Sequence, residues 1–259
     1  MRVLFVGNSH TYANSLPFQL KAMIEHTEGP GACDVHMITP GGKSLDWHAG
    51  EPGTCQTIRY HDWDVVVLQQ QTHPFPGSRE LASAYDRLAP HLDRSGADVM
   101  LYVTWSQQGK PEDQAGIDDA FGRLAAEHGL RLVPVSRAWH RALAEVPGAD
   151  LYAPDGSHAA PAGTYLAACV FYAALTDASP EGVPSRIVVR DDVLVDLPGA
   201  AAAALQRLAW QVVSDPSNWA EPCGVLDECQ RSRWKHADES AAMCSRPGGR
   251  ADGRPGGWM

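Results

Sequence analysis

Short runs of apolar residues alternate with amphipathic stretches through the first 213 residues of the chain. The apolar runs contain little polar alternation, which is typical of strands that are buried on both faces of a parallel sheet. The last run contains Pro134, whose missing N–H suits an edge of the sheet, so we expect that strand to lie there. The predicted strands are 2–6, 34–39, 63–69, 98–105 and 130–135.

The amphipathic stretches predict helices at 15–26, 81–92, 112–128, 136–144, 161–175 and 200–213. In the first of them, Leu16, Leu20 and Met23 share one face, and Pro17 suits the first turn. Gly129 is a suitable C-cap for the helix that ends at His128. Strands that alternate with helices predict an α/β protein whose parallel sheet is covered by helices on both faces.

The composition changes after about Ser217, which divides the chain into a predicted domain at 1–216 and a predicted tail at 217–259. Glycine and proline are frequent in the tail, and its large apolar residues are scattered without a period. We therefore expect a disordered C-terminal tail without a core of its own. Its six cationic and six anionic residues cancel, so the formal net charge of −10 lies entirely in the domain.

The charge and cysteine patterns exclude several classes of function. Without a basic stripe we expect no nucleic-acid partner. No segment is long enough to span a bilayer, and no signal peptide precedes the first strand, so we expect no membrane partner and a cytoplasmic protein. The six cysteines lack metal-ligand spacing and are expected to be free thiols. No pattern in the chain specifies an oligomeric state.

Two motifs carry the chemistry. Gly7-Asn8-Ser9-His10-Thr11 follows the carboxyl end of the first strand, where open α/β sheets bind their ligands. Asp155-Gly-Ser-His158 precedes a predicted helix. A serine hydroxyl, a histidine that can deprotonate it and an aspartate that can orient the histidine are the groups required for nucleophilic acyl transfer. Each motif also has a plain structural alternative, in which Ser9 only turns the chain and Asp155 only caps the following helix.

Two further turns offer hydrogen-bond donors. Gly42 lies in Pro-Gly-Gly after the second predicted strand and can present its N–H without a side chain in the way. Gln69, Gln70 and Gln71 end the third strand, and a carboxamide can donate to an oxyanion. A plain turn and solvation of the strand end are the alternatives for these two segments.

These four blocks, in this order, resemble the SGNH hydrolases, also called the GDSL lipase/esterase superfamily. The resemblance covers residues 2 to about 176, and we take the helix at 200–213 to belong to it. It implies a three-layer α/β/α sandwich with a central parallel sheet, a flavodoxin-like arrangement. It also implies that Ser9 is the nucleophile, that Asp155 and His158 complete a triad, and that the N–H groups of Ser9 and Gly42 hold the oxyanion.

The chain departs from the family pattern at several positions. Gly-Asn-Ser-His replaces Gly-Asp-Ser-Leu, and the third block lacks Gly-x-Asn-Asp. Either Gln71 or Gln69 could replace the family's asparagine as the third oxyanion donor. His10, Asn8 and Thr72 are candidates for the substrate pocket.

We therefore expect a serine hydrolase that cleaves a small-molecule acyl ester, such as an O-acetyl ester or a thioester, through an acyl-serine. The alternatives are an acyltransferase with the same site and a non-catalytic ligand-binding module. Neither HExxH nor GxGxxG occurs, so we expect no metal and no cofactor.

Overall fold

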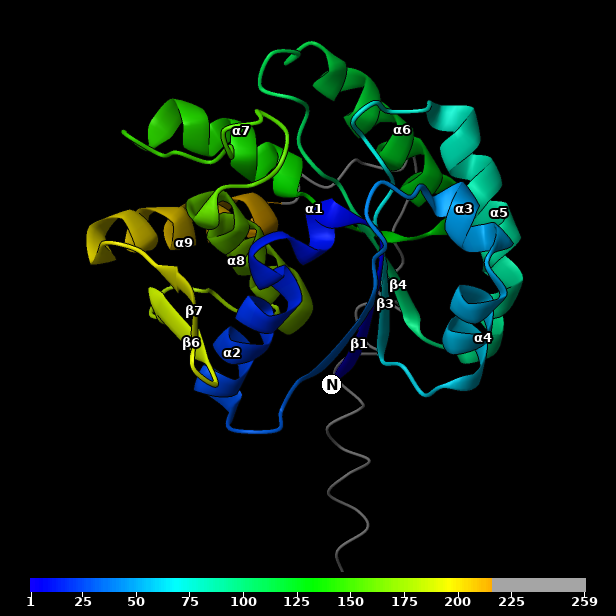
Figure 1. Ribbon diagram of the computed structural model, residues 1–259, viewed down its shortest axis with the longest axis horizontal. Helices are drawn as coiled ribbons and strands as arrows, with labels where there is room; N and C mark the ends of the chain where they lie inside the picture. The colour runs from blue at the N-terminus through cyan, green and yellow to red at the C-terminus, as the bar shows by residue number, and fades with distance from the viewer. Residues whose placement is uncertain (216–259) are drawn as a thin grey trace, which may run out of the picture. The chain divides into compact units, whose positions relative to one another are not determined.

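A five-stranded parallel sheet lies at the centre of the computed structural model, which describes residues 1–215 (Figure 1). Its strand order is β2-β1-β3-β4-β5, so β5 is at an edge as predicted, although Pro134 lies one residue beyond its last paired position. All four strand pairings are parallel, as predicted. The strands are β1 (Arg2–Val6), β2 (Asp34–Ile38), β3 (Val65–Leu68), β4 (Asp98–Tyr102) and β5 (Arg131–Val133).

Helices cover both faces of this sheet, which confirms the three-layer α/β/α arrangement (Figure 1). Successive side chains of β1 alternate between two cores: Val3 and Phe5 pack on one side, and Leu4 and Val6 on the other. The helices packed on the side of Val3 are α2 (Leu16–Glu28), α7 (Val135–Glu145), α8 (Pro161–Thr176) and α9 (Gly199–Ser214). Those on the side of Leu4 are α3 (Leu45–Gly50), α4 (Pro52–Tyr60), α5 (Ser78–Ser95) and α6 (Asp113–His128).

Helix α8 is apolar on nearly all sides because α2, α7 and α9 pack against it. Thirteen of its sixteen residues are buried, and many are small. Gly163 shows how closely the chain packs there, since a Cβ at this position would lie 2.3 Å from the carbonyl oxygen of Leu151. Leu151 begins the loop that carries Asp155 and His158, so α8 packs directly against the start of that loop.

The strands at the centre of the sheet are shorter than the apolar pattern predicted. The expected strand 63–69 is paired only over Val65–Leu68, and the expected strand 98–105 only over Asp98–Tyr102. Just beyond these ends single backbone bonds continue, from Gln69 N–H to Val6 O and from Val103 N–H to Val133 O. Side-chain contacts then take over: Asn8 N–H donates to Gln69 Oε1, and the hydroxyls of Thr72 and Thr104 lie 2.8 Å apart. The ends of the strands therefore form loops above the sheet.

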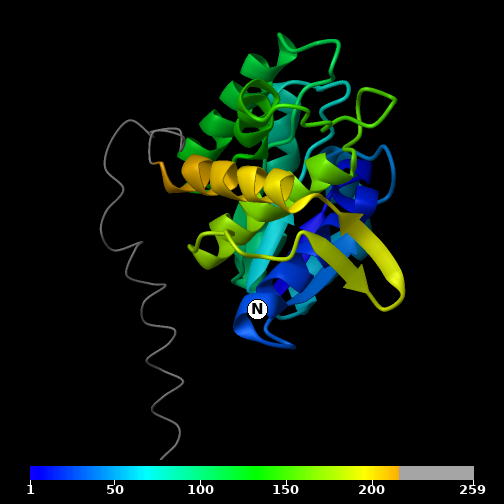
Figure 2. The ribbon, with the colours of Figure 1, turned by 90° about the vertical axis from the view of Figure 1, so that its left-hand side faces the viewer.

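Several elements were not predicted from the sequence. They are helices α1 (Ser9–Tyr12), α3 and α4, the short 3-10 turn η1 (Ala13–Ser15), and a hairpin of β6 (Arg186–Val189) and β7 (Asp192–Asp196). The hairpin, yellow in Figure 2, contacts α2 and η1. Its turn contains Arg190 in the left-handed region, with φ of 55°, and none of the glycine or asparagine signals of a tight hairpin.

The predicted tail at 217–259 and the predicted domain end at residue 216 lie outside the described residues. Within residues 1–215, no helix is both long and apolar enough to cross a membrane. Cys33, Cys55 and Cys169 are buried free thiols in this part of the chain.

Candidate active site

The turn after β1 holds Ser9 at the start of α1. Gly7 is required by close packing, since a Cβ there would lie 2.5 Å from Oε1 of Gln69. The His48 ring, which is fully buried, donates from Nε2 to the carbonyl of Gly7 at 2.8 Å. Asn8 caps α1 by accepting from the N–H of His10. Ser9 therefore stands at the carboxyl end of a central strand, on a turn that is fixed from several sides.

Asp155 and His158 lie on a loop that returns on itself before α8. The loop is closed by backbone bonds from Ala153 N–H to His158 O at 2.8 Å and from Ala160 N–H to Leu151 O at 2.8 Å. Asp155 Oδ1 accepts from the N–H of His158 and from that of Ser157, each at 2.9 Å. The backbone of the loop therefore fixes the position of the Asp155 carboxylate independently of its contact with the imidazole of His158.

The structure brings the three predicted side chains into one chain of hydrogen bonds. His158 Nδ1 lies 2.6 Å from Asp155 Oδ2, and His158 Nε2 lies 2.8 Å from Ser9 Oγ, across 149 positions of sequence. A carboxylate can only accept, so Nδ1 carries the proton and Nε2 presents a lone pair to the hydroxyl. This is the arrangement in which a histidine can remove a serine proton.

The Asp155 carboxylate is kept ionised by its hydrogen bonds. The ring N–H of His158 and the two backbone N–H groups hold the pKa of Asp155 well below its usual range. Its side chain is half exposed, so burial opposes ionisation only weakly. Asp155 can therefore orient His158 and stabilise an imidazolium without taking the proton itself.

Two backbone N–H groups near Ser9 are free to bind an oxyanion. Among the described residues, neither the N–H of Ser9 nor that of Gly42 has a hydrogen-bond acceptor. Gly42 has φ of 68°, in the left-handed region, and nothing stands within 4 Å of where its Cβ would be. Asn8 joins the two segments, because its Nδ2 donates to the carbonyl of Lys43 at 3.0 Å.

The Asn8 contacts give a physical reason for asparagine where the family pattern has aspartate. The side chain, only 1% exposed, accepts at Oδ1 from His10 N–H and donates from Nδ2 to Lys43 O. An ionised aspartate would place a second acceptor against the Lys43 carbonyl in a buried site, where water does not screen the repulsion between the two oxygens. Asn8 is thus a support of the site, and its burial argues against contact with substrate.

The three glutamines have different places in the structure. Gln69 is fully buried, its Oε1 accepts from Asn8 N–H and from Thr11 Oγ1, and its Nε2 donates to Gln70 O at 2.6 Å. Gln69 therefore holds the nucleophile turn and is a poor source of an oxyanion donor. Gln70 Oε1 accepts from the N–H of Leu45. Gln71 is half-buried, with only a long 3.4 Å contact from its amide, so it is the better of the two predicted candidates.

The rings of His10 and His73 form a cluster with the ring of His158, and His10 is the buried member. The His10 ring stacks on the ring of His158 at 5.1 Å between centroids, and its Nε2 lies 3.1 Å from His73 Nδ1. Burial, and then the neighbouring rings of His73 and His158, lower the pKa of His10 to about 3. Burial also lowers the pKa of His73. Both rings are therefore neutral at neutral pH, and of the three rings it is His158 whose Nε2 lies 2.8 Å from Ser9 Oγ.

His10 and Thr72 do not line an open pocket. His10 is packed among rings, and Thr72 is buried with its hydroxyl 2.8 Å from that of Thr104. Trp105 and Trp139 are also fully buried, stacked at 3.8 Å. Sequence reasoning missed His73 and Ser157 as members of the site, since a His before a proline and a Ser inside Asp-x-x-His carry no distinctive local signal.

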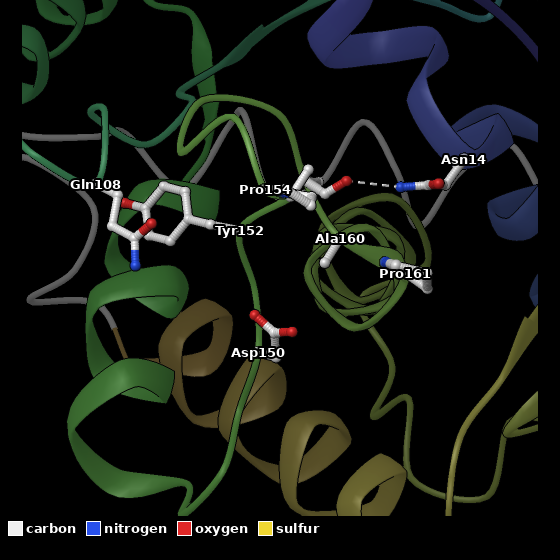
Figure 3. Close-up of a pocket in the computed structure, with 9 residues that line it drawn as sticks. Asn14, Gln108, Asp150, Tyr152, Pro154, Ala160 and Pro161 are labelled. Atoms are coloured by element: carbon white, nitrogen blue, oxygen red, sulfur yellow. Dashed lines mark hydrogen bonds between the residues drawn. The ribbon is translucent and has the colours of Figure 1, made fainter.

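A separate pocket of about 450 Å³ opens beside the Asp155–His158 loop (Figure 3). Figure 3 shows Asn14 bonded across its edge, from Nδ2 to Ala159 O at 2.8 Å. None of the three triad side chains lines it. Its walls are Asn14, Gln108, Asp150, Tyr152, Ala153, Pro154, Ala159, Ala160 and Pro161.

Comparison with known proteins finds similarity in structure. No protein-family model and no curated protein sequence matches the chain. A DUF4886 family protein from Bacteroides uniformis has a TM-score of 0.62 at 19% identity, over 86% of this chain and 98% of the other. An acetylxylan esterase from Geobacillus stearothermophilus has a TM-score of 0.54 at 14% identity, over 67% and 93%. A protein from Parabacteroides merdae named a GDSL-like lipase has a TM-score of 0.54 at 15% identity, over 68% and 95%.

Proposed function

We propose that this chain, which has the fold of the SGNH hydrolases, is a serine esterase that cleaves a small-molecule acyl ester through an acyl-serine. The observation that carries the proposal is the unbroken chain from Asp155 through His158 to Ser9, at 2.6 and 2.8 Å. The esterase and lipase names among proteins of similar fold support it. An O-acetyl ester or a thioester is the expected class of substrate.

The first half of the reaction forms the acyl-enzyme. Ser9 Oγ attacks the acyl carbonyl carbon while its proton passes to Nε2 of His158, and the carbonyl oxygen becomes an oxyanion. The N–H groups of Ser9 and Gly42, with the carboxamide of Gln71, donate to that oxygen. The C–O or C–S bond to the leaving group then breaks, and His158 returns its proton to the leaving alcohol or thiol.

The second half repeats these steps with water. His158 takes a proton from a water molecule as the water oxygen attacks the acyl carbon. His158 then protonates Ser9 Oγ as the acid is released. Asp155 keeps the His158 ring oriented and stabilises the imidazolium in both halves. The neutral, stacked ring of His10 adds no positive charge beside that imidazolium. The steps need no metal or cofactor.

Two assays on the purified full chain test the proposal. The first measures hydrolysis of p-nitrophenyl acetate, and the second measures labelling by a fluorophosphonate with the adduct located by mass spectrometry. We expect labelling at Ser9, and losses on the order of 1000-fold or more in kcat for Ser9→Ala and for His158→Ala.

Ser179→Ala is the matched control, because it removes a loop hydroxyl that caps the N–H of Glu181 and has no link to the triad. It should retain wild-type activity and labelling. Wild-type hydrolysis by Ser9→Ala would overturn the role of Ser9. A wild-type protein that neither hydrolyses esters nor reacts with the phosphonate would favour a binding module instead.

A further inference from the structure

Three residues that the proposed reaction does not use form a closed ring of hydrogen bonds beside the triad. Trp105 Nε1 donates to Ser157 O at 2.9 Å, and Ser157 Oγ lies 2.6 Å from His73 Nδ1. The ring closes where His73 Nε2 lies 2.8 Å from Trp105 O. Ser157 also donates its own N–H to Asp155 Oδ1, which accepts the N–H of His158 as well.

The direction of each bond in this ring follows from its chemistry. A carbonyl oxygen can only accept, so His73 Nε2 carries the proton that is donated to Trp105 O. In the neutral ring, Nδ1 then presents a lone pair, and the hydroxyl of Ser157 donates to it. Burial, which lowers the pKa of His73, favours this neutral ring.

The Asp155–His158 loop needs such an anchor because its reactive side chains are partly in solvent. The side chain of Asp155 is 50% exposed and that of His158 is 36% exposed. The other backbone bond that ties the tip of the loop to the rest of the protein runs from Gln108 N–H to Gly156 O at 2.9 Å. At Ser157, both the hydroxyl and the carbonyl are held.

The anchor itself is rigid. Trp105 is fully buried and stacks on Trp139 with ring planes 8° apart. His73 also reaches the nucleophile segment, since its Nδ1 lies 3.1 Å from Nε2 of His10, the residue after Ser9. The same histidine thus contacts the segment that carries the nucleophile and the loop that carries the base.

We propose that His73 is a positioning residue, which holds the Asp155–His158 loop in register with Ser9 by accepting the hydrogen bond from the Ser157 hydroxyl. This inference rests on the proposed function. It concerns the distance between His158 Nε2 and Ser9 Oγ. Misplacing a catalytic group by about 1 Å costs on the order of 100-fold in rate.

The test compares variants that remove or retain the bond. Ser157→Ala removes the donor and His73→Leu removes the acceptor, whereas Ser157→Thr keeps a hydroxyl and His73→Asn keeps an acceptor near the position of Nδ1. We expect kcat to fall about 10-fold to 100-fold in the first two variants with KM within twofold, because proton transfer and not substrate binding is affected. The two conservative variants should recover most of kcat.

A double-variant cycle gives a second measurement. Both single changes remove the bond between Ser157 and His73, and His73→Leu also removes the contacts with Trp105 O and His10. If the Ser157 hydroxyl acts only through His73, the double variant should lose no more kcat than His73→Leu alone. His140→Gln is the matched control, since it removes another half-buried ring that contacts a backbone carbonyl, that of Ser136. The rate at which a fluorophosphonate labels Ser9 should fall in proportion to kcat.

Clear results would overturn the inference. Wild-type kcat in Ser157→Ala, a change confined to KM, or losses that multiply in the double variant would each exclude a positioning role for this bond. If His73→Leu does not fold, the pair Ser157→Ala and Ser157→Thr decides, because it alters one small side chain. Ser9→Ala separates the two proposals: if it is inactive while Ser157→Ala is wild-type, only the positioning role fails.

Discussion

Replacing His10 by leucine should make the protein less sensitive to acid. His10 is 7% exposed, and burial lowers its pKa to about 3 from the ordinary value of 6.5. Below pH 6.5 the unfolded chain therefore binds a proton that the folded chain refuses. Stability from the neutral ring is complete above pH 6.5 and is lost as the pH falls toward 3. Between pH 7.5 and pH 5 this amounts to about 2 kcal/mol for His10.

This figure is nearly the same for any folded pKa below about 4, because at pH 5 the titration of the unfolded chain sets it. Burial also lowers the pKa of His48 and His73, but both rings remain in the variant. The difference between the two proteins therefore isolates His10.

The assay is urea unfolding at pH 7.5 and pH 5 for the wild type and His10→Leu. Between pH 7.5 and pH 5, the free energy of unfolding should fall by about 2 kcal/mol more in the wild type than in the variant. Ile24→Val is the control, since it removes a methyl group from the core and should lower the free energy of unfolding by about 1 kcal/mol at both pH values. If wild type and His10→Leu lose the same free energy, the folded ring accepts a proton and the reasoning is refuted.

Three other substitutions test the site and its support. Asn8→Asp should lower kcat by about 10-fold or more, because the carboxylate cannot donate to Lys43 O and the Gly-containing loop would shift; steady-state kinetics with an unchanged kcat would contradict this. Asp155→Asn should lower kcat by on the order of 100-fold to 10,000-fold, since an amide does not hold His158 in the required tautomer; a loss below tenfold in the same assay would count against the triad. Gly163→Ala should lower the free energy of unfolding by about 1–3 kcal/mol, because its Cβ would lie 2.3 Å from a carbonyl oxygen; an unchanged urea midpoint would show that α8 can move away.

The fold could be predicted from sequence to the extent that each element has its own pattern. The run Val65–Leu68 is apolar throughout because both of its faces are covered, and this pattern predicted a strand buried on both faces of a parallel sheet. Helix α4 was missed because it buries only Thr54, Cys55 and Ile58, too few apolar positions to show a period. The hairpin was missed because its turn lacks the residues that usually mark one.

The sequence by itself determined which local turns could carry a nucleophile and an acid–base pair, since Gly-Asn-Ser and Asp-x-x-His each lie within a few residues. Only the tertiary structure decided how the polar side chains are paired. Gln69 was an equal candidate for the oxyanion until its carboxamide was found against Asn8, 61 positions away. His73 had no local signal, yet it meets Ser157 across 84 positions. Hydrogen bonds act over about 3 Å and in set directions, so partners that are remote in sequence are chosen by packing and leave no periodic trace in the chain.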